Sequence, residues 1–454
     1  MLETQQLAAT RVDDEPTVRV SVPAPKAFSR KFIFLILFIA FLVNAAMVLV
    51  GLPKVSRALA PAYSMNYGDL YDLIAKNVGQ GNGYRVDANM GYTMLREPGY
   101  PLLLAAAFRL GGYGIQTARG ACVLLAFGAA LLLLLLTQEI ASDSMTALTA
   151  ALLFLLYPGI LVAEIRAGSE LPSIFTVMLF MLALHGALKK ESLWNYGAAG
   201  LFLGAAVLVR SEVLLFPVLL LIYLLFAAKG WAERRKAVER ITVLALGTTA
   251  VMSPWIIRNY KLVHSLVPTA TVAGVAAQTG LYTCENASPD EPFVLTDSKA
   301  GLDRARMAEQ LRIPFVGAYY YQIFYTPQDE LEFDRALRKN VSAEYRGHPE
   351  ILAKCAFRNL FFNFWFLGKT PKSVLLNMLV QAPLLALALA GIVILWKQKL
   401  LRNASMILLY IFYIPAVHAP ILAQARYSML VVPFLSILAA VFLVSAWRRL
   451  SQRV

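Results

Sequence analysis

Residues 69–101 read DLYDLIAKNVGQGNGYRVDANMGYTMLREPGYP and form the first polar segment after the first hydrophobic run of the chain. The first part of this stretch has the apolar spacing of a short amphipathic helix, and the glycines within 79–83 end that helix. A second apolar piece starts at residue 98, directly after Arg96 and Glu97. Charged groups therefore gather at a predicted membrane boundary, which favours a site for a lipid-borne anionic substrate.

The composition excludes a soluble protein. Of the 454 residues, 58% are hydrophobic and 15% are charged, and the mean hydropathy is +0.60. The formal net charge of +14 could indicate a nucleic-acid partner. The lysines and arginines, however, cluster at the ends of hydrophobic runs, which is the pattern of membrane topology signals. We therefore predict an all-α polytopic membrane protein with no nucleic-acid partner.

The hydrophobic runs predict about ten transmembrane helices. The segments are 32–52, 116–137, 145–160, 171–188, 193–209, 213–228, 239–257, 374–396, 404–418 and 427–446. The apolar run 98–111 is too short to span a bilayer, so we predict a juxtamembrane helix on the outer face. With that choice, Lys189 and Lys190 and the basic cluster 229–236 face the cytoplasm, as the positive-inside rule requires.

These spans divide the chain into four parts with both termini in the cytoplasm. The predicted parts are a disordered cytoplasmic tail (1–30), a transmembrane catalytic module (31–257) with a first outer loop (53–115), an extracytoplasmic domain (258–373) and C-terminal transmembrane helices (374–454). The end of the extracytoplasmic domain is rich in aromatic residues and amphipathic, which is typical of a helix lying on a bilayer surface.

The cysteines and histidines do not predict a metal site. Cys122, Cys284 and Cys355 lack metal-ligand spacing, and only the last two could share a compartment and form a bridge. The four histidines show no ligand spacing either. The chain contains neither a P-loop nor a Rossmann glycine pattern. We expect no cofactor and no metal ligands, and leave a dependence on divalent metal open.

Charged residues at the outer ends of spans are the informative ones, because topology does not require them there and their burial is costly. They are Asp69, Asp72, Arg96, Glu97, Glu164, Arg166, Glu170, Arg210, Glu212, Arg258 and Arg426. Together they predict a pocket at the outer mouth of the bundle that binds a phosphate and moves a proton. Each also has a simpler interpretation: a solvated loop acid, an interfacial arginine anchor, or a charge that suits a helix end.

The chain resembles the polyprenyl-phosphate-dependent glycosyltransferases of the GT-C class, which include protein O-mannosyltransferases of glycosyltransferase family 39 and the aminoarabinose transferases. The matching pieces are GDLYDLIAKNVGQGNGY, REPGYPLLLAA, SELPSIF, LLVRSEVLLFP, SPWIIRNY and ARYSMLVVPFL, in this order. The similarity covers most of residues 31–260. The order and spacing of the pieces carry the resemblance more than any single piece.

The resemblance implies that Asp69 is the catalytic base. It also implies residues that hold the donor's lipid phosphate, and we assign this role to Arg96, Arg210, Arg258 and Arg426. Further acids assigned to the pocket are Asp72, Glu97 and Glu170. Many relatives carry a second acid directly after the base, whereas this chain has Leu70 there. A two-carboxylate or metal role therefore does not transfer to this chain.

The expected function is transfer of a hexosyl or pentosyl group from a polyprenyl-phosphate donor to an extracytoplasmic glycan, lipid or protein acceptor. The resemblance implies a bacterial inner membrane location, with the active site facing the periplasm or exterior. Two alternatives stay open: a flippase or transporter of lipid-linked sugars, and a non-catalytic subunit of an envelope polysaccharide system. A transporter commonly shows internal repeats and broken helices at the bilayer midplane, and no repeat is evident here.

Overall fold

The computed structural model describes residues 29–51, 69–286, 293–317, 322–368 and 370–452. The predicted disordered tail lies almost entirely outside the described residues. Within them the protein is nearly all helical, as predicted, and contains one short two-stranded antiparallel sheet in which β1 (Phe315–Val316) pairs with β2 (Ile323–Phe324).

The first half of the described chain forms the helices that surround the polar segment. They are α1 (Arg30–Ala46), η1 (Met47–Gly51), α3 (Tyr71–Gly79), α4 (Gly99–Gly111), α5 (Ile115–Ala141), α6 (Ser144–Leu155), α7 (Pro158–Arg166), α8 (Glu170–Lys190), α9 (Leu193–Val209), η3 (Ser211–Leu215), α10 (Phe216–Ala227) and α11 (Trp231–Val263). The second half continues with α12 (Ala273–Asn286), α13 (Phe293–Gln310), α14 (Pro327–Gly347), α15 (Pro349–Arg358), η4 (Asn359–Asn363), α16 (Phe364–Phe366), α17 (Pro371–Lys397), α18 (Ser405–His418), α19 (Ala425–Ser428) and α20 (Val432–Ser451).

The protein is a multi-pass membrane protein. Six of the described helices are long and apolar enough to cross a bilayer, and the bent pair α6 and α7 brings the number to seven if it forms one span. Three shorter apolar helices, α9, the η3–α10 segment and α18, occupy the remaining predicted spans. All ten predicted segments are therefore helical, but the count of ten spans stays a prediction.

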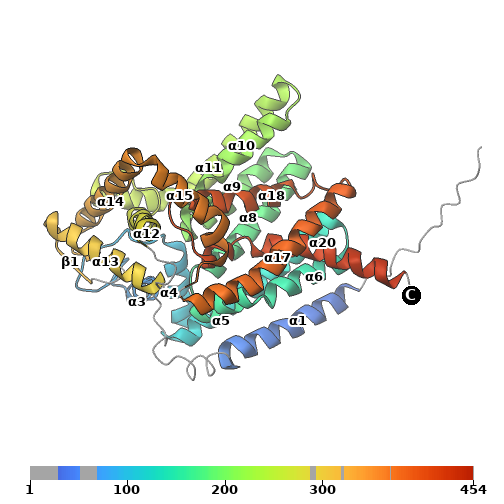
Figure 1. Ribbon diagram of the computed structural model, residues 1–454, viewed down its shortest axis with the longest axis horizontal. Helices are drawn as coiled ribbons and strands as arrows, with labels where there is room; N and C mark the ends of the chain where they lie inside the picture. The colour runs from blue at the N-terminus through green and yellow to red at the C-terminus, as the bar shows by residue number, and fades with distance from the viewer. Residues whose placement is uncertain (1–28, 52–68, 287–292, 318–321, 369, 453–454) are drawn as a thin grey trace, which may run out of the picture.

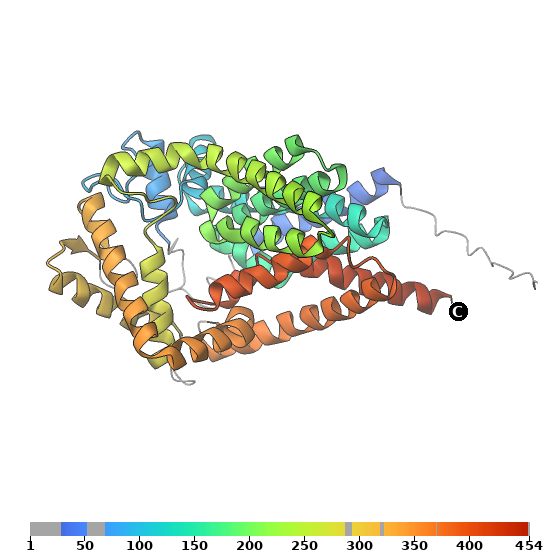
Figure 2. The same ribbon diagram turned by 90° about the horizontal axis from the view of Figure 1, so that it is seen from above.

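One predicted boundary differs clearly from the structure. Helix α11 continues to Val263, past the predicted end of the span at residue 257, so Arg258 lies inside a helix. The polar loop that follows leads into α12. The predicted juxtamembrane helix is α4, and it packs against α3, α5 and α9. Both views of the chain place α12, α13 and α14 at the end of the helical bundle where α3 also lies (Figures 1 and 2).

Helices α9 and α11 pack closely because glycines line their contact. A Cβ on Gly200 would lie 2.1 Å from the carbonyl oxygen of Leu244, and one on Gly204 would lie 2.7 Å from that of Thr248. Small residues at this spacing let two backbones approach within a membrane. The close contact between α9 and α11 thereby fixes the end of α9, where Arg210 follows.

We expect Gly200→Ala to destabilise the protein by about 1–3 kcal/mol, because the added methyl group forces the two backbones apart. The measurement is the melting temperature in detergent. Gly186→Ala in α8 is the matched control, since a Cβ there meets no heavy atom within 4 Å. Equal melting temperatures for the two variants would contradict the packing argument.

The segment formed by residues 273–366, here called the polar unit, is held to the 69–101 segment by a buried acid. Thr93 Oγ1 donates to Glu330 Oε2 over 2.5 Å, Met94 N donates to Oε1 over 2.9 Å, and Thr271 Oγ1 also donates to Oε1. The Met94 carbonyl in turn accepts from Thr271 N over 3.0 Å. Glu330 therefore fixes the backbone at Met94, two residues before Arg96.

Burial raises the pKa of Glu330, and the hydrogen bonds from its three partners oppose this shift. The pKa of Glu330 is higher in the folded state than in the unfolded state, so protonation of this carboxyl stabilises the fold. This stabilisation is fully present below a pH of about 4.3, the usual pKa of glutamate, and it is lost as the pH rises through the folded-state pKa. The difference in stability between wild type and Glu330→Gln should therefore fall as the pH rises toward neutrality. Melting temperatures across this range measure it, with the exposed neighbour Glu332→Gln as control for a lost charge; a constant difference would contradict the assignment.

A disulfide joins two helices of the polar unit. Cys284 in α12 and Cys355 in α15 are bonded, with their Cα atoms 5.6 Å apart. The sequence had left a bridge between these two cysteines as a possibility. The bond ties the amphipathic helix α15 to the body of the polar unit.

Candidate functional site

The carboxylate of Asp69 lies between two arginines from distant parts of the chain. Arg96 Nη2 is 3.5 Å from Asp69 Oδ1, and Arg426 Nη1 is 3.2 Å from Asp69 Oδ2. Asp69 and Arg426 are separated by 357 positions in the sequence. The side chain of Asp69 keeps 27% of its surface exposed, so a small molecule can reach it. We call these three residues the Asp69 cluster.

Arg96 is held in place from both sides. Its Nε donates to the backbone oxygen of Asp69 over 3.0 Å, and its guanidinium lies 5.0 Å from the centre of the Tyr71 ring. The hydroxyl of Tyr84 donates to the carbonyl oxygen of Arg96 over 2.9 Å. The arginine side chain is only 8% exposed. Arg96 is therefore oriented before any ligand binds.

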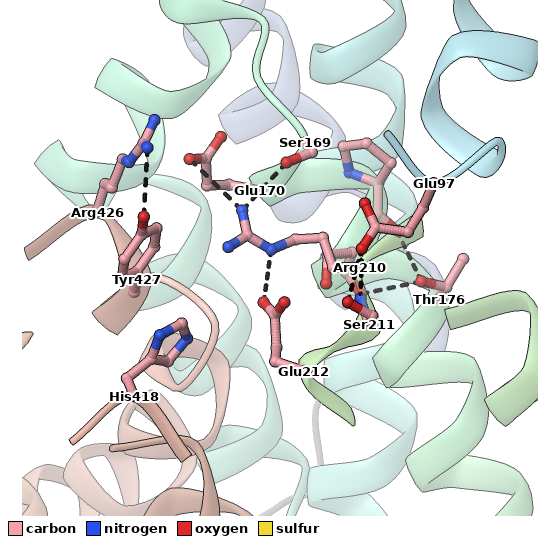
Figure 3. A network of polar contacts seen from close by, with 12 residues as sticks. Glu97, Ser169, Glu170, Thr176, Arg210, Ser211, Glu212, His418, Arg426 and Tyr427 are labelled. Carbon is pink, nitrogen blue, oxygen red and sulfur yellow. Dashed lines mark hydrogen bonds and ion pairs between the residues drawn. The ribbon is translucent and has the colours of Figure 1, made fainter. Parts of the chain in front are cut away.

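Arg210, at the end of α9, sits among acids and a hydroxyl (Figure 3). Its Nε donates to Glu212 Oε1 over 2.5 Å, its Nη1 donates to Ser169 Oγ over 3.1 Å, and Glu170 Oε1 lies 3.9 Å away. All three charged side chains are at most 13% exposed. The structure thus brings together Arg210 and Glu170, which the sequence assigned to the pocket separately.

Tyr427 connects this group to the Asp69 cluster. Its ring centre is 5.3 Å from the Arg210 guanidinium and 5.1 Å from that of Arg426, and Arg426 Nη2 donates to its hydroxyl over 3.3 Å. The imidazole of His418 stacks on the same ring with centroids 4.5 Å apart. The sequence analysis did not select Tyr427. The motif ARYSML, which places it next to Arg426, is the signal that could have identified it.

Glu97 supports the turn that carries Arg210. It accepts hydrogen bonds from Ser211 N over 3.3 Å and from Ser211 Oγ over 2.6 Å, and it is 4% exposed. Burial raises the pKa of Glu97, and the bond from Ser211 opposes the shift. The structure therefore places this predicted pocket acid in contact with Ser211, the residue after Arg210.

Asp72 points toward a different part of the molecule. Its Oδ2 accepts a hydrogen bond from the hydroxyl of Tyr113 over 3.1 Å, in the turn between α4 and α5. Burial raises the pKa of Asp72, against the lowering effect of Tyr113. Asp72 thus joins α3 to this turn and is 6% exposed.

Arg258 lies in a separate aromatic cluster. Its Nη1 donates to the carbonyl oxygen of Thr93 over 2.8 Å and to Asn259 Oδ1 over 2.9 Å. Its guanidinium lies 4.6 Å from the Trp255 ring and 5.4 Å from the Tyr84 ring. Here Arg258 supports the loop that leads to Arg96, and direct contact with a donor phosphate stays a prediction.

The acids of the site do not gather as metal ligands do. Over the described ranges, no group of three or more histidine, cysteine, aspartate or glutamate side chains has a geometry that could hold a metal ion. The site instead presents two guanidinium groups, of Arg96 and Arg426, with the carboxylate of Asp69 between them.

The family model of the dolichyl-phosphate-mannose-protein mannosyltransferases matches residues 96–257, which run from Arg96 to the last residue before Arg258. No curated protein sequence matches the chain significantly.

Among solved structures, the archaeal oligosaccharyltransferase AglB from Archaeoglobus fulgidus, in complex with an inhibitory peptide and a dolichol-phosphate, is 13% identical with a TM-score of 0.53. The match covers 93% of this chain and 52% of that one. The chain has the GT-C fold. The fold expected from the sequence motifs is thus confirmed. The chain spans about half the length of the archaeal enzyme. ArnT from Cupriavidus metallidurans bound to undecaprenyl phosphate is also 13% identical, with a TM-score of 0.38 and coverage of 90% of this chain and 77% of that one.

Proposed function

We propose that this chain is a membrane glycosyltransferase that moves a sugar from a polyprenyl-phosphate donor to an acceptor outside the cytoplasm. The observation that carries the proposal is the Asp69 cluster, in which one partly exposed carboxylate lies between two guanidinium groups. A guanidinium pair suits a phosphate, and a carboxylate suits the proton of an acceptor hydroxyl. The matched family and the archaeal enzyme support a lipid-phosphate donor.

The reaction in this proposal is a direct displacement at the anomeric carbon. The acceptor oxygen forms a bond to that carbon, its proton moves to Asp69, and the bond to the phosphate oxygen breaks with polyprenyl phosphate as the leaving group. Negative charge grows on the phosphate as the bond breaks. Arg96 and Arg426 therefore stabilise the transition state more than the ground state.

Asp69 and the donor phosphate compete for the same guanidinium donors. In this structure Arg426 Nη1 is engaged by Asp69 Oδ2. The phosphodiester of the donor, whose single negative charge is shared by two non-bridging oxygens, would take over part of this contact. The carboxylate would then turn to the acceptor hydroxyl, so donor binding prepares the base. Arg210 lies across Tyr427 from Arg426, and its charge is already balanced by Glu212 and Glu170.

The polar unit supplies the acceptor side in this proposal. Its disulfide between Cys284 and Cys355 is typical of an oxidising, extracytoplasmic compartment. Glu330 fixes it against the segment that carries Arg96. We therefore assign the polar unit to the exterior, as a platform for a glycan, lipid or protein acceptor.

The test uses purified full-length protein in lipid vesicles with a panel of radiolabelled polyprenyl-phosphate sugars. Transfer of label, or hydrolysis of a donor in the absence of acceptor, would support the glycosyltransferase and begin to identify the sugar. Movement of labelled lipid between leaflets without turnover of any donor would instead identify a flippase and overturn the proposal.

A further inference from the structure

A glutamine inside the spanning helix α17 makes two directed hydrogen bonds. The hydroxyl of Tyr157 donates to Gln381 Oε1, and Gln381 Nε2 donates to Ser428 Oγ over 3.1 Å. Gln381 is 2% exposed, Ser428 is fully buried and Tyr157 is 7% exposed. Polar side chains within spanning helices are costly unless paired, so they commonly mark a function. None of the roles described above uses Gln381.

The two bonds fix which way the amide faces. A tyrosine hydroxyl that donates must meet the amide oxygen, which leaves the amide N–H groups facing Ser428. The Ser428 hydroxyl, accepting from the amide, donates in turn to the carbonyl oxygen of Ala425 over 2.7 Å. The chain of hydrogen bonds therefore runs in one direction, from Tyr157 through Gln381 to the backbone of α19.

Helix α19 depends on contacts from outside itself. It comprises only Ala425–Ser428, and a helix of one turn is not stable on its own. Its first backbone N–H, on Ala425, donates to the carbonyl oxygen of Leu367 over 3.1 Å, and its last residue receives the bond from Gln381. Between these two anchors lie Arg426 and Tyr427, the residues that face Asp69 and Arg210.

We propose that Gln381 is a positioning residue for the donor phosphate site. It holds the C-terminal end of α19 so that Arg426 reaches the Asp69 carboxylate and Tyr427 lies between the two guanidinium groups. The inference rests on the proposed function, because the donor phosphate is what Arg426 would bind. Gln381 itself contacts neither Asp69 nor Arg426 in the hydrogen bonds that the structure shows for it.

The first measurement is binding of undecaprenyl phosphate to the full-length protein in nanodiscs. Gln381→Met keeps the length of the side chain and removes both hydrogen bonds, and a shift of α19 by about 1 Å should weaken binding by roughly tenfold to a hundredfold. Thr137→Val is the matched control, because Thr137 is likewise buried in a spanning helix and its hydroxyl bonds only within that helix, to Leu133 O over 2.7 Å. The control should bind as wild type does.

A double-mutant cycle separates positioning from general stability. If Gln381 acts through Arg426, then Gln381→Met should weaken binding less than twofold further in an Arg426→Ala background. Hydrogen exchange gives a readout that does not depend on any ligand. The backbone amides of residues 425–431 should exchange faster in Gln381→Met and remain as in wild type in Thr137→Val. Ser428→Ala, which removes only the receiving hydroxyl, should reproduce the effect if Gln381→Met does not fold.

The outcomes are distinct for the two proposals. If wild type does not bind undecaprenyl phosphate, or any other polyprenyl phosphate of the panel, the proposed function fails and the role of Gln381 fails with it. If wild type binds and both Gln381→Met and Ser428→Ala bind as Thr137→Val does, the proposed function stands and the positioning role is overturned. An additive effect in the Arg426→Ala background would also overturn it.

Discussion

Replacing Asp69 by asparagine is expected to lower sugar transfer by about a hundredfold to ten-thousandfold, because an amide cannot take the proton of the acceptor hydroxyl. The substitution preserves the size of the side chain. It also leaves one oxygen that can accept from Arg426, so the cluster should remain assembled. Donor affinity should therefore change much less than the rate of transfer. A loss confined to the rate is the signature of a base.

The measurement is single-turnover transfer with donor already bound, together with the affinity for the donor lipid. Asp87→Asn is the control, since Asp87 is an exposed acid of the same segment whose carboxylate accepts only a local bond from Asn89 N among the hydrogen bonds described for it. It should retain wild-type rates. Turnover that survives in Asp69→Asn would remove the assignment of the base, while leaving a phosphate-binding role for the arginines.

The sequence identified the members of the site better than their partners. Asp69 and Arg96 belong to one short polar segment, so their proximity follows from local structure. Arg426 is 357 positions away from Asp69, and its place at the outer end of a span did not indicate that it contacts Asp69. Hydropathy predicts which end of a span a charge occupies. It does not predict which of the charges at that end touch one another.

Burial and partner choice explain the predicted residues that lie elsewhere. Asp72 is one helical turn from Asp69 and was assigned to the same pocket, yet its carboxylate bonds to Tyr113 in another turn. The direction in which a side chain leaves a short helix decides this, and helix α3 begins after Leu70, a residue with positive φ of 66°. That local backbone geometry is not readable from hydrophobic spacing.

The predicted end of α11 is wrong because the side chains become polar before the helical backbone ends. The predicted span ended at residue 257 because hydropathy falls at Arg258, whereas α11 continues to Val263. Hydropathy reports the surroundings of side chains, and helical hydrogen bonding continues in polar surroundings. Arg258 therefore projects from a helix into an aromatic cluster with Trp255 and Tyr84.

Replacing Arg426 by alanine is expected to lower transfer by a hundredfold or more, corresponding to about 2–4 kcal/mol of transition-state stabilisation. The reason is that Arg426 contacts the carboxylate of Asp69 and the hydroxyl of Tyr427, so it serves both the base and the charge on the leaving phosphate. Unlike the change at Asp69, this loss should appear in donor affinity as well as in the rate. Arg426→Lys should recover only part of the activity, because an ammonium cannot reproduce the fork of donors of a guanidinium.

Donor affinity and single-turnover rates for Asp69→Asn, Arg426→Ala and the double variant test this shared role. If the two groups act as one unit, the double variant should be far less impaired than the product of the two single effects predicts. Arg449→Ala controls for the loss of a positive charge, since it lies exposed near the end of α20, outside the site. Strict multiplication of the two effects would show that Arg426 and Asp69 act independently, in which case their contact in the structure does not contribute to transfer.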